Sequence, residues 1–150
     1  MIKMFDKFRF YNKGVKADYS AIVLDDKSKN LLLSTFIYPK PEYADWNKSA
    51  DHMTICMGEL PEHMKRYWLD EEVSLTVNEI GVSDKSIAVK VTGFFVISKR
   101  NDTVGRGSNF QHITLAFNPI DGKPSDSNQI IDWKNTKHLK LRGVVKEVEI

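Results

Sequence analysis

A short strand-like pattern that occurs twice, 60 residues apart, constrains the fold of this chain more than any other feature. His52-Met53-Thr54-Ile55 and His112-Ile113-Thr114-Leu115 both alternate a polar residue with an apolar one. Such alternation predicts a β-strand with one polar face and one buried face. Residues i and i+2 share a face of a strand, so each histidine is expected beside its threonine. The other face is predicted to be part of the core. It carries Met53, Ile55 and Met57 in the first copy, and Ile113, Leu115 and Phe117 in the second.

His-x-Thr triplets occur more often in this chain than random placement of its residues predicts. The chain has 4 His and 7 Thr, and random placement predicts roughly 0.2 His-x-Thr triplets. A strand with only a structural role does not need a titratable ring followed by a hydroxyl on its polar face. We therefore interpret His52, Thr54, His112 and Thr114 as candidate catalytic residues.

The composition is that of an ordinary folded domain, expected to span residues 1–150. Hydrophobic residues make up 41% of the chain, which is enough for a core. A net charge of +2 argues against a protein that coats DNA or RNA, but allows a local basic cleft. The single cysteine, Cys56, excludes an internal disulfide and a zinc site built from several cysteines. The lone cysteine and the lack of a signal-peptide or membrane-span pattern predict a cytoplasmic protein.

The remaining sequence predicts strands interspersed with short helices. Strands are expected over residues 19–24, 73–80, 87–97 and 139–150. Helices are expected over residues 29–36, 62–69 and 125–133. Residues 73–97 are expected to form an antiparallel hairpin. Each His-x-Thr strand is thus flanked by antiparallel strands and a helix, so the predicted fold class is α+β with two similar halves.

With both motifs in place, the chain resembles the two-histidine (2H) phosphoesterase superfamily, which carries a His-x-Thr/Ser motif on each of two central strands. The resemblance extends from about residue 19 to the last strand, and both motifs match without substitution. It implies a bilobal fold with pseudo-two-fold symmetry, in which antiparallel sheets line a central cleft and helices cover the outer faces. It also assigns the catalytic roles to His52, Thr54, His112 and Thr114.

The same four residues suit phosphodiester cleavage without a metal or other cofactor. One histidine can act as base toward the nucleophile while the other protonates the leaving oxygen. The threonine hydroxyls can donate to the nonbridging phosphate oxygens. Cys56 and Ala116 follow the two threonines at the same spacing and are expected to leave room for the phosphate. Which histidine is the base stays open, because it depends on the orientation of the substrate.

The candidate substrate-binding residues lie in two other segments. Lys99, Arg100 and Arg106 belong to a glycine-containing basic loop that leads to His112, where they would either receive phosphates or form a solvated hairpin loop. Tyr11 belongs to an aromatic N-terminal segment that would either stack on a base or cover the core.

The expected function is a phosphodiesterase acting on a nucleotide. The resemblance implies two substrate classes: a cyclic oligonucleotide second messenger, as for phage anti-CBASS enzymes that destroy host immune signals, and RNA ends with a 2′,3′-cyclic phosphate, as in RNA repair. Small size and near-neutral charge favour the cyclic oligonucleotide. If the chain is viral, the expected location is the host cytoplasm. The alternative from another class is a binding protein that sequesters its nucleotide without cleaving it. Neither DNA nor a membrane is an expected partner, and the oligomeric state is left open.

Overall fold

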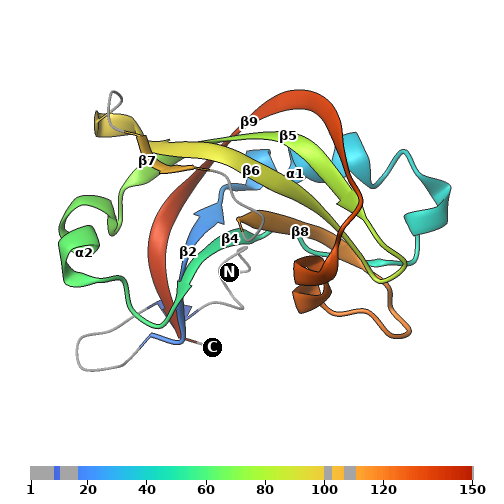
Figure 1. The fold of residues 1–150 in the computed structure, drawn as a ribbon, viewed down its shortest axis with the longest axis horizontal. Helices are drawn as coiled ribbons and strands as arrows, with labels where there is room; N and C mark the ends of the chain where they lie inside the picture. The colour runs from blue at the N-terminus through green and yellow to red at the C-terminus, as the bar shows by residue number, and fades with distance from the viewer. Residues whose placement is uncertain (1–8, 11–16, 100–102, 107–110, 150) are drawn as a thin grey trace.

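The chain folds around one extensive antiparallel sheet (Figure 1). The computed structural model describes residues 9–10, 17–99, 103–106 and 111–149. Its strands are β1 (Arg9–Phe10), β2 (Tyr19–Leu24), β3 (Asn47–Lys48), β4 (His52–Met57), β5 (Glu72–Val82), β6 (Ser86–Val96), β7 (Thr103–Arg106), β8 (His112–Phe117) and β9 (Trp133–Glu149). The predicted strands are therefore present, and the hairpin over residues 73–97 is confirmed as the antiparallel pair β5–β6.

Six of these strands close into a ring. Each strand pairs with the next in the order β8–β4–β2–β9–β5–β6, and β6 pairs again with β8. The closure depends on β9, whose 17 residues allow it to pair with β2 along one part and with β5 along another. The family resemblance implied antiparallel sheets that line a central cleft. The structure confirms a mixed helix-and-sheet chain with antiparallel strands, but joins the strands into one closed sheet.

Short helices fill the connections. They are the α-helices α1 (Asp26–Phe36) and α2 (Glu62–Trp68), and the 3-10 helices η2 (Pro41–Tyr43), η3 (Ile97–Lys99) and η4 (Pro124–Gln129). Helix α1 begins where the Asp25 carboxylate accepts a hydrogen bond from the backbone N–H of Ser28, at 2.8 Å. The helix predicted over residues 125–133 is wrong in type and extent, because only the 3-10 helix η4 forms there and Trp133 already begins β9.

A small buried cluster of Tyr19, Ala21, Val23 and Val148 is separate from the main core, which lies on one face of the closed sheet. The largest fully buried side chains of the main core include Ile22, Met53, Leu75, Ile113 and Leu141, from five of the six ring strands. Met53 and Ile113 are the central residues of the two His-x-Thr motifs. Because side chains alternate along a strand, the burial of these two residues turns the histidines and threonines toward the opposite face.

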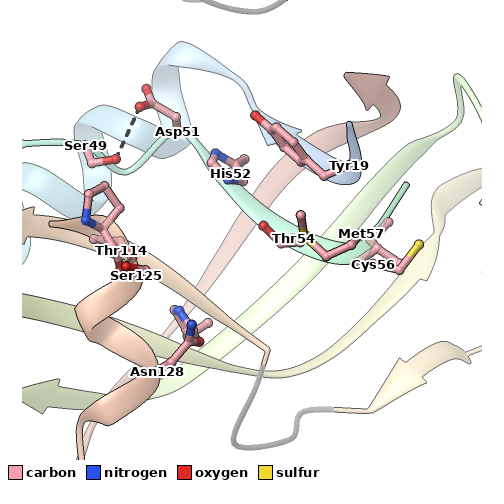
Figure 2. Close-up of a pocket in the computed structure, with 13 residues that line it drawn as sticks. Tyr19, Ser49, Asp51, His52, Thr54, Cys56, Met57, Thr114, Ser125 and Asn128 are labelled. Atoms are coloured by element: carbon pink, nitrogen blue, oxygen red, sulfur yellow. Dashed lines mark hydrogen bonds between the residues drawn. The ribbon is translucent and has the colours of Figure 1, made fainter. Parts of the chain in front are cut away.

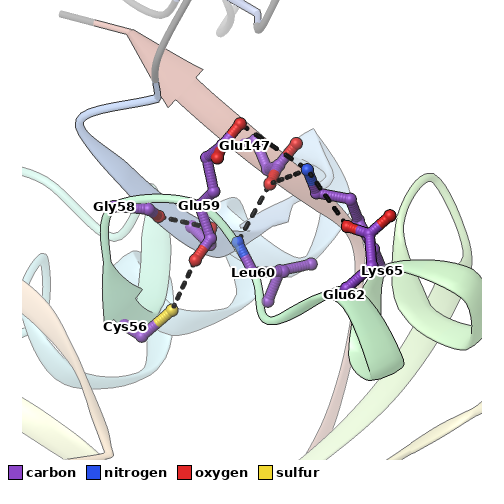
Figure 3. Close-up of polar contacts among 8 residues, drawn as sticks. Cys56, Gly58, Glu59, Leu60, Glu62, Lys65 and Glu147 are labelled. Carbon is purple, nitrogen blue, oxygen red and sulfur yellow. Dashed lines mark hydrogen bonds and ion pairs between the residues drawn. The ribbon is translucent and has the colours of Figure 1, made fainter.

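A buried carboxylate holds the segment that follows the first motif strand (Figure 3). Glu147 of β9 is only 2% exposed, and its Oε2 accepts a hydrogen bond from the backbone N–H of Leu60, at 2.9 Å. The ammonium group of Lys65 in α2 lies 3.5 Å from the same oxygen. Nearby, the Ser20 hydroxyl donates to the carbonyl of Gly58, at 2.7 Å. These contacts connect the end of β4 to β2, β9 and α2.

Replacing Glu147 with alanine is expected to lower the free energy of unfolding by about 1–3 kcal/mol, because the buried N–H of Leu60 would lose its acceptor. Glu147→Gln keeps an acceptor oxygen and should lose less than half as much. Urea unfolding followed by tryptophan fluorescence measures both changes. Equal stability of the alanine variant and the original protein would show that this carboxylate does not hold the segment.

Candidate active site

The two motif strands lie side by side in the sheet. Met53 of β4 pairs directly with Ile113 of β8, and the strands run antiparallel. Counting outward from this pair places each histidine directly opposite the threonine of the other strand. The two histidines are then diagonal neighbours, with a backbone separation of roughly 7–8 Å. The pairing therefore gathers both motifs on one small area of one face.

Both motif strands carry a β-bulge immediately after the threonine. In the β2–β4 pair, Thr54 and Cys56 oppose consecutive residues of β2, so Ile55 is the extra residue. In the β6–β8 pair, Thr114 and Ala116 oppose consecutive residues of β6, so Leu115 is extra. A bulge bends its strand and redirects the side chains that follow it. The two motifs thus share a local irregularity at the same position as well as a sequence.

The bulges explain where the predictions for the following residues are wrong. Met57 was expected in the core, but its side chain is 79% exposed and lines the cavity described below. Cys56 and Ala116 were expected to be equivalent small residues beside the phosphate. Cys56 does line the cavity, whereas Ala116 is fully buried in the core. Simple alternation fails here because an extra residue interrupts it.

A cavity of about 580 Å³ lies over the motif face (Figure 2). It brings together all four predicted catalytic residues, with side chains from β2, from the segment before β4, and from η4. The lining residues are Tyr19, Ser49, Asp51, His52, Thr54, Ile55, Cys56, Met57, His112, Thr114, Pro124, Ser125 and Asn128. This volume is typical of a site for a small ligand, for which cavities of roughly 300–1,000 Å³ are common.

Tyr19 forms the wall beside the first histidine, as Figure 2 shows. Its ring centroid lies 5.3 Å from that of His52, with the ring planes inclined by 35°. Burial, followed by the carboxylates of Asp51 and Asp18, raises the pKa of Tyr19 to about 12. The phenol therefore keeps its proton at neutral pH and is available as a hydrogen-bond donor at the cavity wall.

Both candidate catalytic rings have one buried nitrogen. The Nδ1 atoms of His52 and His112 are buried, while each ring as a whole is partly exposed and lines the cavity. With Nδ1 buried, Nε2 is the ring nitrogen that we expect to exchange a proton with a molecule in the cavity. General acid and base catalysis requires one such nitrogen of each histidine within hydrogen-bond reach of the substrate.

The carboxylate beside the first motif is neutralised by an ion pair. Asp51 is 2% exposed, and its Oδ1 lies 2.8 Å from the ammonium group of Lys29 in α1. Its Oδ2 accepts a hydrogen bond from the Ser49 hydroxyl, at 3.3 Å. Among the side chains that the structure describes, no lysine or arginine lines the cavity. Within this part of the chain, the histidines are thus the cavity groups able to carry positive charge toward an anion.

The predicted substrate-binding residues lie partly or wholly outside the part of the chain that the structure describes. Tyr11 and Arg100 lie outside the described residues. Lys99 ends η3, which follows β6, and Arg106 ends β7, while their side chains lie outside the described part. Lys90 of β6 pairs with His112, and β6 continues for six more residues, so η3 begins roughly 20 Å along the sheet from that histidine.

The backbone of Arg106 is closer to the site. Strand β7 returns along β6 and pairs Arg106 with Gly93, three residues from the position opposite His112. By strand spacing this is roughly 10 Å. Lys99 and Arg106 are the two predicted substrate-binding residues whose backbone is described. The structure therefore brings the backbone of Arg106 toward the site and leaves that of Lys99 farther away.

Several cavity residues were not predicted from the sequence. Tyr19, Ser49 and Asp51 come from the strand and loop before the first motif, and Ser125 and Asn128 come from η4. Asp51 directly precedes His52 in the sequence and Ser49 is three residues before it, which is the one local signal that could have indicated them. Figure 2 shows Ser125 and Asn128 on the wall formed by η4, apart from the strand that carries His52. The packing of η4 against β8 and β6 brings them to the site.

Comparison with known proteins adds no assignment: no protein-family model matches the sequence, and no curated protein matches it significantly. Among the described residues, no group of three or more His, Cys, Asp or Glu side chains is arranged to hold a metal ion. Within the same part of the chain, no helix is long and apolar enough to cross a membrane.

Proposed function

We propose that this chain is a phosphodiesterase of the two-histidine type, which cleaves a nucleotide phosphodiester by general acid and base catalysis without a metal. The observation that supports this most directly is the cross-strand arrangement of His52, Thr54, His112 and Thr114 around one cavity. Two imidazoles and two hydroxyls on a common face supply a base, an acid and hydrogen-bond donors for a phosphate. The chemistry needs no further group for proton transfer.

The approximate symmetry of the sheet supports the same family. The strand order β9–β2–β4 on one side of the motif pair corresponds to β5–β6–β8 on the other. Both β4 and β8 carry a bulge after the threonine. We take this correspondence to reflect a pseudo-two-fold axis between β4 and β8, which a 2H phosphoesterase would have. In this proposal the two halves of the ring correspond to the two lobes of that fold.

The proposed reaction is an in-line displacement at phosphorus. A neutral histidine removes a proton from the nucleophile, which is water for a 2′,3′-cyclic phosphate or the adjacent ribose 2′-hydroxyl for a 3′–5′ linkage. The new P–O bond forms as the bond to the leaving oxygen breaks, and the protonated second histidine gives that oxygen its proton. Thr54 and Thr114 donate to the nonbridging oxygens, where negative charge increases in the transition state.

A cyclic oligonucleotide second messenger is the substrate that we favour. The cavity has the size of a small-ligand site and includes apolar walls from Ile55 and Met57. The net charge of the chain is only +2, whereas a long RNA would be bound mainly through cationic contacts to its phosphates. Cleavage of such a messenger in the cytoplasm of a bacterial host would suit a phage protein that evades immune signalling.

Incubation of the purified protein with a panel of cyclic di- and trinucleotides and an RNA ending in a 2′,3′-cyclic phosphate tests the proposal. We expect linear products from at least one cyclic oligonucleotide, at a rate unchanged by EDTA, because the histidines supply the acid and the base. Chromatography of the products measures the outcome.

Other results of this assay would correct the proposal in different ways. Cleavage of the RNA end alone would assign the protein to RNA processing instead. Recovery of an intact bound nucleotide after heat denaturation, with no product, would indicate a binding protein that sequesters its ligand. Loss of activity in EDTA, restored by added divalent metal, would contradict the metal-independent mechanism.

A further inference from the structure

The two motif threonines, although related by sequence and register, have different hydrogen-bond partners. The Oγ1 atom of Thr114 lies 2.8 Å from the hydroxyl of Ser127 in η4 and donates to the carbonyl of Pro124, at 3.2 Å. The Ser127 hydroxyl in turn lies 2.5 Å from the hydroxyl of Ser86 in β6. For Thr54, no side-chain hydrogen bond occurs among the described residues. One motif is therefore supported by a chain of hydroxyls that the other lacks.

Ser86 and Ser127, the two serines in this series of hydroxyls, do not line the cavity. Ser86 is fully buried and Ser127 is 1% exposed, so neither hydroxyl can exchange its partner for water. A buried hydroxyl without a partner costs about 1–3 kcal/mol, which favours the arrangement that satisfies each group. Each hydroxyl has one proton, and the Pro124 carbonyl can only accept. Donation from Ser86 to Ser127, from Ser127 to Thr114 and from Thr114 to Pro124 satisfies all three hydroxyls.

The distances show which bond can be exchanged. At 2.8 Å, the contact between Ser127 and Thr114 has the usual length of a hydroxyl–hydroxyl hydrogen bond. At 3.2 Å, the bond from Thr114 to the Pro124 carbonyl is longer than the usual 2.5–3.0 Å and is therefore weak. The proton of Thr114 can leave that carbonyl for a phosphate oxygen while Ser127 continues to donate to Thr114.

We infer that Ser127 is a positioning residue that acts through Thr114. Its hydroxyl holds the Thr114 oxygen at the cavity and, by donating to it, makes Thr114 a stronger donor to the phosphate. Ser86 anchors Ser127 from β6. This inference rests on the proposed function, because it assigns Thr114 a phosphate contact. It also predicts that Thr114 donates to the phosphate with the help of the Ser127 hydroxyl, whereas Thr54 donates without such help.

A double-mutant cycle between Ser127 and Thr114 tests this inference with the most active substrate of the panel. Ser127→Ala is expected to lower kcat about tenfold, the loss of one assisting hydrogen bond, and to change KM less than twofold. Thr114→Val should lower kcat more strongly, because it removes the donor itself. If Ser127 acts through Thr114, adding Ser127→Ala to Thr114→Val should produce no further loss of kcat.

Ser28→Ala is the matched control for general effects of removing a buried hydroxyl. Ser28 is 5% exposed, and its hydroxyl accepts a hydrogen bond from the backbone N–H of Arg142, at 2.7 Å, outside the cavity lining. This variant should lose stability as Ser127→Ala does but keep its kcat. If both variants lose kcat equally, or if the effects of Ser127→Ala and Thr114→Val add fully, Ser127 has only a structural role.

Two further comparisons keep the test decisive. If Ser127→Ala does not fold, the same cycle is run with Ser86→Ala, which removes the far end of the chain of hydroxyls, and the same non-additivity with Thr114→Val is expected. Inactivity of the original protein toward every substrate would contradict the proposed function. An active original protein with an additive cycle would overturn this inference alone.

Discussion

Alanine in place of either His52 or His112 is expected to lower kcat at least 10²-fold and up to about 10⁴-fold, the range typical for loss of a general acid or base. The two rings lie diagonally across one strand pair and line one cavity, so each proton transfer depends on one of them. The double variant should be hardly slower than the single ones, because residues that act as a unit are strongly non-additive. Single-turnover rates with excess enzyme measure the chemical step.

The pH dependence distinguishes catalytic rings from structural ones. With one histidine required neutral and the other protonated, the pH profile of kcat/KM of the original protein should be bell-shaped, and each alanine variant should lose one limb. His63→Ala is the control, since this exposed histidine of α2 does not line the cavity. A variant of either motif histidine with unchanged kcat and an unchanged profile would exclude that histidine from catalysis.

Thr54→Val is expected to lower kcat about 10²-fold, since removing one positioned donor to developing charge typically costs 10²–10³. Among the described residues, the Thr54 hydroxyl makes no side-chain hydrogen bond, so its loss leaves no protein group without a partner. The free energy of unfolding should therefore change by less than about 0.5 kcal/mol. Thr54→Ser keeps the hydroxyl and should retain most of the activity.

Thr114→Val provides the contrast within the same protein. It should also lower kcat, but it removes a partner of the buried Ser127 hydroxyl and should destabilise the fold by about 1–3 kcal/mol. Urea unfolding and initial rates, measured on both valine variants, give the comparison. A Thr54→Val variant that loses stability but no activity would indicate that Thr54 supports the fold and does not contact the phosphate.

The repeated motif contained enough information to predict the candidate catalytic residues. Alternation of polar and apolar residues placed His52 and Thr54 on one strand face and Met53 on the other, and the structure buries Met53 fully. The same holds for Ile113 in the second copy. This succeeds because the two-residue period of a strand is a local property of the backbone.

Prediction failed where non-local pairing decides the outcome. Neither bulge can be recognised within the motif strand alone, because a bulge exists only relative to the partner strand. The bulge after Thr54 exposes Met57, which simple alternation placed in the core. The closed ring likewise depends on β9 finding two partners far away in the sequence.

By itself, the sequence predicted the candidate catalytic residues and determined which strand face presents them, because these follow from residue type and the alternation of side chains. Only the tertiary structure decided that the two motifs are neighbours, with each histidine opposite the other strand's threonine. It also decided that Tyr19 lies against His52 and that Ser127 supports Thr114. The physical reason is that these contacts join segments distant in the chain, and their geometry is set by strand register and by the packing of η4, for which no local pattern exists.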